Sequence, residues 1–215
     1  MPRLVSGLDA TRIRANLDRV REDIAAAGRD PGAVDILAAV KYVPVEEIGV
    51  LGEAGLTVLG ENRAQDLEQK ATQHPEFRWH FIGALQSRKV KLIVPYVELI
   101  HSVASESALR RLEQHAERQT EILLEVNVAG EEGKAGIAPE ELPHYLEIAP
   151  VKVTGLMTMP PYAEDPEDSR RHFARLAELA AEHHLPQLSM GTSQDYAVAA
   201  SEGATIVRIG TTLYA

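Results

Sequence analysis

The sequence predicts an α/β fold, a single (β/α)8 TIM barrel preceded by an N-terminal helix. Three observations predict it: eight short apolar runs, a longer amphipathic stretch between neighbouring runs, and several runs that are apolar on both faces. Strands that alternate with helices need crossover connections, and the resulting parallel sheets bury strands on both faces. Eight such units favour closure into a barrel, and an open doubly wound sheet is the alternative.

The first element is a helix over residues 8–27, in which apolar side chains recur at spacings of four, three and four from Ile13 to Ile24. Gly28 and the turn at residues 30–32 end it. The apolar runs that we expect to be strands are 34–40, 57–59, 78–82, 98–103, 121–128, 151–157, 187–190 and 205–209. The helices expected between and after them are 45–54, 63–73, 87–94, 105–118, 140–148, 169–183 and 195–202.

The composition restricts the classes of protein that the chain can belong to. A chain of 215 residues that is 45% hydrophobic can bury one sizeable core, so we expect one domain over residues 1–215. The net charge is -10 and no basic stripe is present, which argues against nucleic acid as a partner. The chain has no cysteine, no apolar run long enough to span a membrane and no signal-peptide pattern, so we expect a cytoplasmic protein.

Lys41 directly follows the first expected strand, and active sites of (β/α)8 barrels lie at the C-terminal ends of their strands. It is the one lysine of six that is placed straight after a core strand. Desolvation at a barrel mouth raises the fraction of free amine, and a free amine can form an imine with an aldehyde. The alternative is a lysine whose ammonium simply reaches solvent at a strand end.

The last two expected strands are followed by loops that can bind phosphate, which is where barrels often bind it. Gly191 with Ser193, and Gly210 with Thr211, bring backbone N–H groups and hydroxyls to two adjacent loops. Each loop alone is also explained by turn formation and helix capping. Two such loops at the two expected strands together indicate a phosphate site.

Two further polar residues face the expected mouth. Arg208 lies inside the last apolar strand, where a charge is costly unless it is paired or functional. Asn62 follows the second strand and either faces the mouth or caps the next helix. The histidines show no spacing typical of a metal site, so we expect no metal.

Several segments resemble the pyridoxal phosphate homeostasis protein family, which is similar to the N-terminal barrel domain of alanine racemase. They follow one another across nearly the whole chain, and the Trp-His-Phe-Ile-Gly and Ser-Met-Gly segments are the most specific. The segments are 37–41, 59–63, 79–86, 100–103, 126–128, 155–161, 188–195 and 207–210.

The resemblance implies pyridoxal 5′-phosphate as the cofactor and a barrel of the fold type III class. It implies that Lys41 forms the internal aldimine, and that Ser193, Gly210 and Thr211 lie near the phosphate. It also implies that Arg208 faces the pyridine nitrogen. A guanidinium there keeps this nitrogen unprotonated, because it does not give up its proton.

The resemblance places three further residues around the cofactor or in the mouth: Asn62, Met190 and His80. The chain departs from the family pattern at Ala84, where histidine is common, and at Arg88, where asparagine is common. Thr192 replaces a common methionine. These departures change polar groups at the rim of the mouth, and they do not touch Lys41 or the phosphate loops.

Three functions fit these residues. The first is a non-catalytic carrier that binds pyridoxal phosphate and passes it to apo-enzymes, because too few residues follow the eighth strand to form the separate domain that supplies the second base of alanine racemase. We expect this carrier to be a monomer, because no surplus apolar face stands out beyond the barrel. The second is a small amino-acid racemase with Lys41 as its sole base. The third is a barrel enzyme that uses a metal or a sugar phosphate, in which Lys41 has no role.

Overall fold

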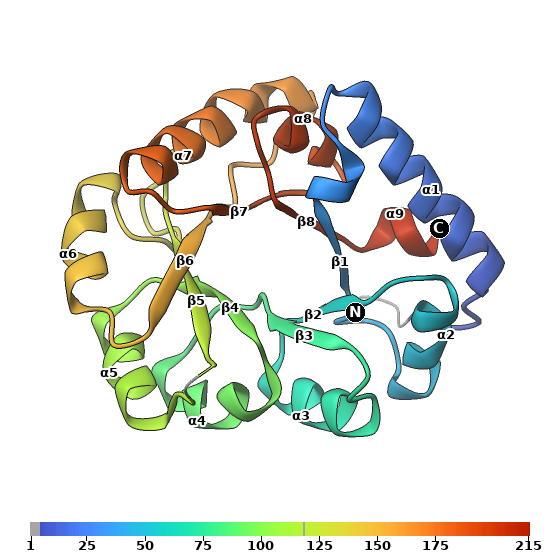
Figure 1. Cartoon of the computed structure of the whole chain (residues 1–215), viewed down its shortest axis with the longest axis horizontal. Coiled ribbons are helices and arrows are strands. Elements are labelled where there is room, and N and C mark those ends of the chain that lie inside the picture. Colours follow the sequence, from blue (N-terminus) through green and yellow to red (C-terminus); the bar gives the residue numbers. More distant parts are fainter. Residues whose placement is uncertain (1–4, 118) are drawn as a thin grey trace.

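A computed structural model describes residues 5–117 and 119–215. Its eight parallel strands form a closed barrel in the order of the sequence, and the last strand pairs with the first (Figure 1). The predicted (β/α)8 barrel with an N-terminal helix is therefore confirmed. The open doubly wound sheet is wrong, because an open sheet would leave both outer strands unpaired.

The helices surround the barrel and separate it from solvent (Figure 1). The strands are β1 (Asp35–Ala39), β2 (Val58–Glu61), β3 (Arg78–Phe81), β4 (Leu99–Val103), β5 (Glu121–Glu125), β6 (Lys152–Met157), β7 (Gln187–Thr192) and β8 (Ile206–Ile209). The α-helices are α1 (Ala10–Ala26), α2 (Ile48–Glu53), α3 (Ala64–Gln73), α4 (Val90–Ile93), α5 (Glu106–His115), α6 (Leu142–Ile148), α7 (Arg170–Glu182), α8 (Tyr196–Ser201) and α9 (Thr211–Tyr214).

Some predicted elements differ from the observed ones. The helix expected over residues 105–118 corresponds to α5, which ends at His115. The last residue of the expected range, 118, lies outside the described part of the chain. The helix expected over residues 87–94 is a short α4 between two 3-10 turns, the second of which contains Pro95. Proline lacks a backbone N–H and cannot continue an α-helix, which explains this break. Helix α9 was not expected.

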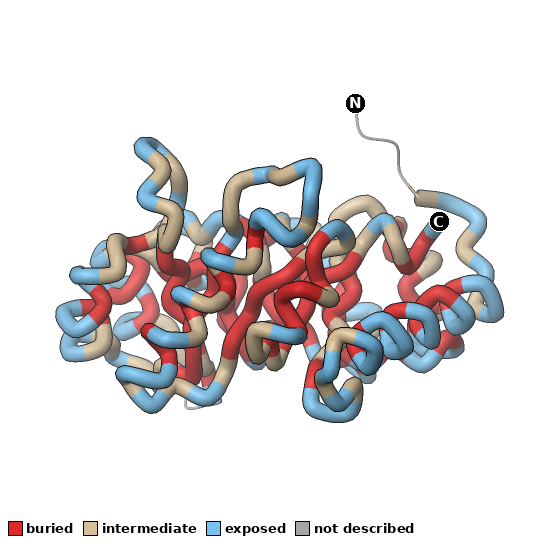
Figure 2. Tube along the Cα trace, turned by 90° about the horizontal axis from the view of Figure 1, so that it is seen from above, coloured by how far each residue is buried: buried red, intermediate tan, exposed pale blue. Residues whose placement is uncertain are grey.

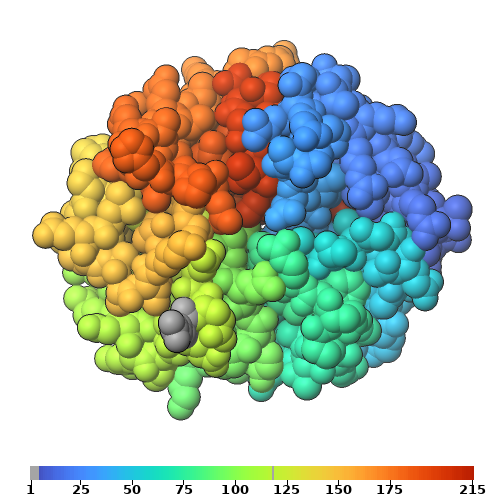
Figure 3. Space-filling view, in the orientation of Figure 1, coloured from blue at the N-terminus to red at the C-terminus, as the bar shows by residue number. Residues whose placement is uncertain are grey.

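Helix α1 covers the side of the barrel where the first strand, β1, pairs with the last strand, β8. The side-chain amide of Asn16, which is buried, donates hydrogen bonds to the carbonyls of Leu213 and Ala215, 3.1 Å away in each case. These bonds hold α9, which has only four residues, against α1. In the space-filling view the N-terminal part (blue) and the C-terminal part (red) accordingly lie side by side (Figure 3).

The buried residues form two separate layers. Figure 2 shows the buried residues in red in the interior of the tube. The larger layer lies between the barrel and its helices and includes Ile13, Phe173 and Met190. The smaller layer fills the inside of the barrel and consists of Leu37, Val58, Leu99, Leu123, Met157 and Ile206, with Ile82 packed against it. Because side chains alternate between the two faces of a strand, the second layer identifies the inward positions of six strands.

Candidate functional site

The inward positions become polar toward the C-terminal ends of the strands. Counting in steps of two from the apolar inner layer leads to His101 in β4, Glu125 in β5 and Arg208 in β8, all of which are buried. Hydrogen bonds connect His80 of β3 and Ser189 of β7 to this set. We call these five residues the polar layer. It lies beneath the mouth of the barrel, where sites of this fold are found.

Lys41 lies at this mouth. It follows β1, and the same count of two from Leu37 puts it on the inward side. The side chain is half-buried, and its Nζ lies 4.8 Å from the centre of the Tyr42 ring, a cation–π contact. Strand pairing places Ala38 beside Ile209, so the chain that leads to Lys41 runs next to the loop that starts at Gly210.

The loops after β7 and β8 meet through one hydroxyl. The Oγ of Ser193 accepts hydrogen bonds from the backbone N–H groups of Gly210, at 3.1 Å, and Thr212, at 3.5 Å. The hydroxyl of Thr212 in turn donates to the Ser193 carbonyl at 3.3 Å. The two backbone amides converge on a single oxygen, which is the arrangement that binds an anion such as a phosphate.

Gly191 is required for the path of the first of these loops. Its φ angle is +89°, and a Cβ atom there would come within 2.6 Å of the Ala199 Cβ. Both the left-handed backbone and the lack of space therefore demand glycine. Next to it, the carboxylate of Asp195 accepts hydrogen bonds from the N–H of Thr192, at 2.7 Å, and from its hydroxyl, at 3.1 Å. These contacts hold Ser193 in a rigid turn.

Arg208 is buried, and its two terminal nitrogens are hydrogen-bonded. Its guanidinium donates to the carbonyl of Ser189 at 2.8 Å, to the hydroxyl of Ser189 at 2.5 Å and to the carbonyl of Thr158 at 2.9 Å. Burial lowers the pKa of Arg208 to about 10, and the carboxylates of Glu125 and Asp195 act in the opposite direction. The group therefore carries a positive charge at neutral pH.

Two histidines continue this network across the barrel. The Nδ1 of His101 lies 2.8 Å from the Ser189 hydroxyl, and its Nε2 lies 3.0 Å from the Nδ1 of His80. Burial lowers the pKa of His80 to about 3 and that of His101 far below its ordinary value, so both rings are neutral at pH 7. The Nε2 of His80 has no hydrogen-bond partner among the described residues.

Asn62 lies at the end of β2, on the inward side by the count from Val58. Its side-chain oxygen is buried without a hydrogen-bond partner among the described residues. Buried polar atoms without a partner are rare and costly, so this oxygen is available for a ligand. Two of the three positions that depart from the family pattern, Ala84 and Arg88, are exposed at the rim.

The site differs in two respects from the one that the sequence predicts. Met190 is fully buried in the layer between barrel and helices, on the opposite face of β7 from Ser189, so its side chain is not at the mouth. His101, Ser189 and Glu125 were not singled out. The alternation of inward and outward side chains along each strand was the signal that could have found all three.

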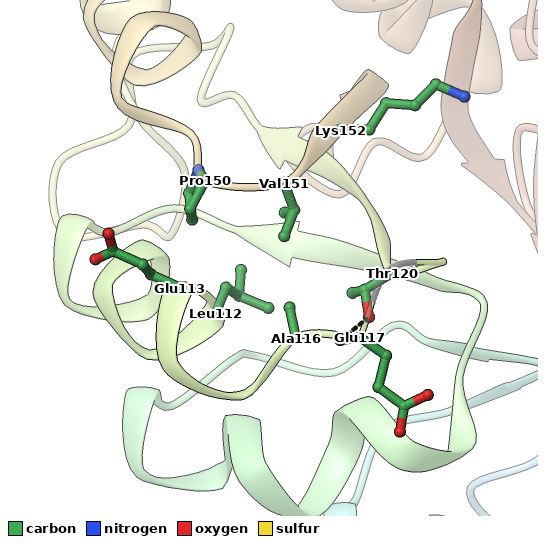
Figure 4. Close-up of a pocket in the computed structure, with 8 residues that line it drawn as sticks. All are labelled: Leu112, Glu113, Ala116, Glu117, Thr120, Pro150, Val151 and Lys152. Carbon is green, nitrogen blue, oxygen red and sulfur yellow. Dashed lines mark hydrogen bonds between the residues drawn. The ribbon is translucent and has the colours of Figure 1, made fainter.

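The opposite end of the barrel carries a surface pocket of about 370 Å³ (Figure 4). Its lining comes from the end of α5 and from the residues that precede or begin β5 and β6, including Leu112, Thr120 and Val151. Because the strands are parallel, this pocket lies away from the mouth. Within residues 5–117 and 119–215, no three acidic or histidine side chains are grouped closely enough to bind a metal. The same residues contain no helix that could cross a membrane.

Comparisons with known proteins agree with this architecture. The family model described as alanine racemase, N-terminal domain, matches residues 8–215. The pyridoxal phosphate homeostasis protein of Aquifex aeolicus is 44% identical over 218 aligned positions, which cover 94% of this chain and 96% of that protein.

Two solved structures share the fold. PipY of Synechococcus elongatus, determined with pyridoxal phosphate bound, has a TM-score of 0.78 and 31% identity, and the match covers 91% of this chain and all of that one. Alanine racemase of Corynebacterium glutamicum has a TM-score of 0.71 at 16% identity, and the match covers 99% of this chain and 63% of that one. Fold and site thus define a barrel of the alanine racemase N-terminal class. Within it, the chain belongs to the pyridoxal phosphate homeostasis protein family.

Proposed function

We propose that this chain binds pyridoxal 5′-phosphate reversibly and serves the homeostasis of that cofactor inside the cell, as a carrier without substantial catalysis. One observation carries the proposal. A half-buried lysine and two backbone amides that converge on one oxygen lie at neighbouring strand ends, β1 and β8, of one barrel mouth. The homeostasis name of the relatives and the cofactor bound to PipY support it.

The residues at the mouth fit the chemical groups of this cofactor. When bound, pyridoxal phosphate supplies an aldehyde, which condenses with a primary amine. Lys41 provides the amine. The amides of Gly210 and Thr212, which hold the Ser193 hydroxyl, are suited to a phosphate oxygen. The unpartnered side-chain oxygen of Asn62 offers a further polar contact.

Arg208 would face the ring nitrogen in this arrangement. Its guanidinium is held by Ser189 and Thr158 and stays protonated at neutral pH. Arginine only donates hydrogen bonds, so it leaves the ring nitrogen unprotonated. An unprotonated pyridine withdraws electrons less strongly than a protonated one. This property is better suited to a carrier of the cofactor than to an enzyme that uses the cofactor for chemistry.

We also propose that the chain acts as one cofactor-binding domain over residues 1–215, as a monomer in the cytoplasm, and that it passes the cofactor to apo-enzymes. Light scattering on the purified protein tests the monomer. Transfer is tested by mixing the loaded protein with an apo-enzyme and following that enzyme's recovery of activity against free cofactor at the same concentration.

The covalent site is tested by trapping with borohydride. The purified protein with pyridoxal phosphate is expected to develop a visible absorption band, and reduction should leave a stable adduct that peptide mass spectrometry locates on Lys41. Lys41→Ala should lose the adduct, whereas Lys91→Ala, which removes an exposed lysine, should keep it. An unchanged adduct in Lys41→Ala would assign the chemistry to another lysine.

The carrier role is tested separately with single-enantiomer amino acids. A carrier is expected to leave their optical rotation unchanged over many molar equivalents. Sustained racemisation that disappears in Lys41→Ala would instead show a small racemase with Lys41 as its base.

A further inference from the structure

A buried ion pair joins the ends of β1 and β2. The Nζ of Lys70, in α3, lies 2.6 Å from the Oε2 of Glu61, at the end of β2. The side chains are only 6% and 0% exposed. Burying two charges costs several kcal/mol per ion before their attraction is counted, and neutral replacements of similar volume are often equally stable. Stability alone is therefore a weak reason for this pair.

The pair is bonded to the backbone at two neighbouring strand ends, those of β1 and β2. Lys70 Nζ also donates to the carbonyl of Val40 at 2.7 Å. The other carboxylate oxygen of Glu61 accepts from the backbone N–H groups of Asn62, at 2.6 Å, and Arg63, at 3.1 Å. One ion pair thus ties the chain before Lys41 to the backbone of Asn62.

The Val40 carbonyl determines the position of the Lys41 Cα atom. It belongs to the planar peptide group that also contains the N and Cα atoms of Lys41, so fixing the carbonyl fixes that Cα. On the other side, the carbonyl of Tyr42 accepts from the N–H of Val5 at 2.9 Å. The backbone before and after Lys41 is therefore held by segments distant in sequence: Lys70 holds the Val40 carbonyl, and Val5 holds the Tyr42 carbonyl, one peptide group beyond those that flank Lys41.

We propose that Glu61 and Lys70 are positioning residues that hold the Lys41 amine and Asn62 in register for the ligand at the mouth. The inference rests on the proposed function, because it assigns the pair to the same site. Neither residue needs to touch the ligand. Their contribution is to reduce the freedom of the amine before binding, which raises the rate of its reaction.

The test replaces both charges at once with Glu61→Gln/Lys70→Met. The matched control is Glu121→Gln/Lys152→Met, which makes the same changes in an exposed pair with the same 2.6 Å separation at the opposite end of the barrel. Both variants are expected to keep the melting temperature within about 5 °C of the wild type. The buried variant should react with pyridoxal phosphate about tenfold more slowly, and the control at the wild-type rate.

A second measurement uses the cofactor-free protein. Acetylation of Lys41 by acetic anhydride is followed across pH against that of the exposed Lys91. The pH profile of Lys41 acetylation should move in Glu61→Gln/Lys70→Met and should not move in Glu121→Gln/Lys152→Met. A purely structural pair would leave this profile unchanged in a folded variant.

Glu61→Asp is measured alongside, because it keeps both charges of the ion pair and shortens the side chain that carries the carboxylate by one methylene. It should slow the reaction by roughly threefold or more. The proposal is overturned if Glu61→Gln/Lys70→Met and Glu61→Asp react with pyridoxal phosphate at the wild-type rate and show the wild-type acetylation profile. If the double variant does not fold, a wild-type rate and profile in Glu61→Asp alone overturn it. Failure of the wild type to form the adduct would instead contradict the proposed function, and the acetylation profile would still test the positioning role.

Discussion

At the level of single residues, burial decides which groups in the barrel carry charge. Arg208 keeps its proton because its ordinary pKa is so high that burial brings it down only to about 10. His80 and His101 start from a pKa near neutrality, so the same burial makes them neutral at pH 7. The network from Arg208 through Ser189 to the two imidazoles therefore places its positive charge at the Arg208 end.

The buried histidines predict that acid destabilises the fold. Below pH 6.5 the unfolded chain binds protons that the folded His80 excludes until the pH nears 3, so the free energy of unfolding falls as the pH drops through this window. His80→Asn should flatten the decline by up to about 1.4 kcal/mol per pH unit. Urea unfolding at pH 7, 6, 5 and 4 measures it.

The control for this experiment is His184→Asn. His184 is exposed and has a φ angle of +55°, which asparagine tolerates. Its pH dependence should match that of the wild type. An identical decline in His80→Asn and the wild type would show that His80 is not held neutral by burial.

At the level of elements, α1 and α9 depend on each other. Helix α9 is too short to cover the strand before it, and α1 packs on the same side of the barrel. Asn16 satisfies two carbonyls at the end of α9. Since α9 begins at Thr211, directly after the Gly210 amide that bonds to Ser193, this contact also supports one of the two loops that we propose bind the phosphate.

Asn16→Ala should lower the free energy of unfolding by about 1–3 kcal/mol, because it leaves the buried Leu213 carbonyl without a donor. Arg19→Ala, at an exposed position of the same helix, should change it by less than about 0.5 kcal/mol. Equilibrium unfolding in urea compares the two variants. Equal stabilities would mean that α9 does not depend on α1.

At the level of the whole molecule, closure of the barrel brings distant residues together. Lys41 and Arg208 are separated by most of the chain, yet β1 pairs with β8, and Leu37 is in register with Arg208. Because the strands are parallel and in sequence order, all eight C-terminal ends lie on one side. A ligand at this mouth therefore contacts both halves of the chain and stabilises the whole fold.

Ligand binding should accordingly raise the melting temperature. Free pyridoxal phosphate at about 100 times its Kd stabilises a single-site protein by about 2.7 kcal/mol, or roughly 5–10 °C for a chain of this size. Pyridoxal, which lacks the phosphate, should give a smaller shift at the same concentration. Both melting temperatures are measured by differential scanning fluorimetry. Equal shifts with pyridoxal phosphate and pyridoxal would show that the loops after β7 and β8 do not bind the phosphate.

The sequence was sufficient to predict the barrel, the helix before it, and the strand ends that carry Lys41, Asn62, Ser193 and Arg208. These features depend on local periodicity and on the rule that parallel strands present their C-terminal ends together. The break at α4 and the existence of α9 were not predicted. The short α4 ends because of Pro95, whereas α9 depends on packing against α1, which outweighs local propensity in so short a helix.

The sequence by itself determined that a parallel barrel forms and that Lys41, Asn62, Ser193 and Arg208 lie toward the C-terminal ends of its strands, because hydrophobic periodicity is a local property of the chain. Only the tertiary structure decided that His101 and Ser189 connect His80 to Arg208, that Met190 faces the helices, and that Lys70 reaches Val40 and Glu61. Such contacts join residues far apart in the chain. Their geometry exists only once the barrel has closed and burial has set the charge of each group.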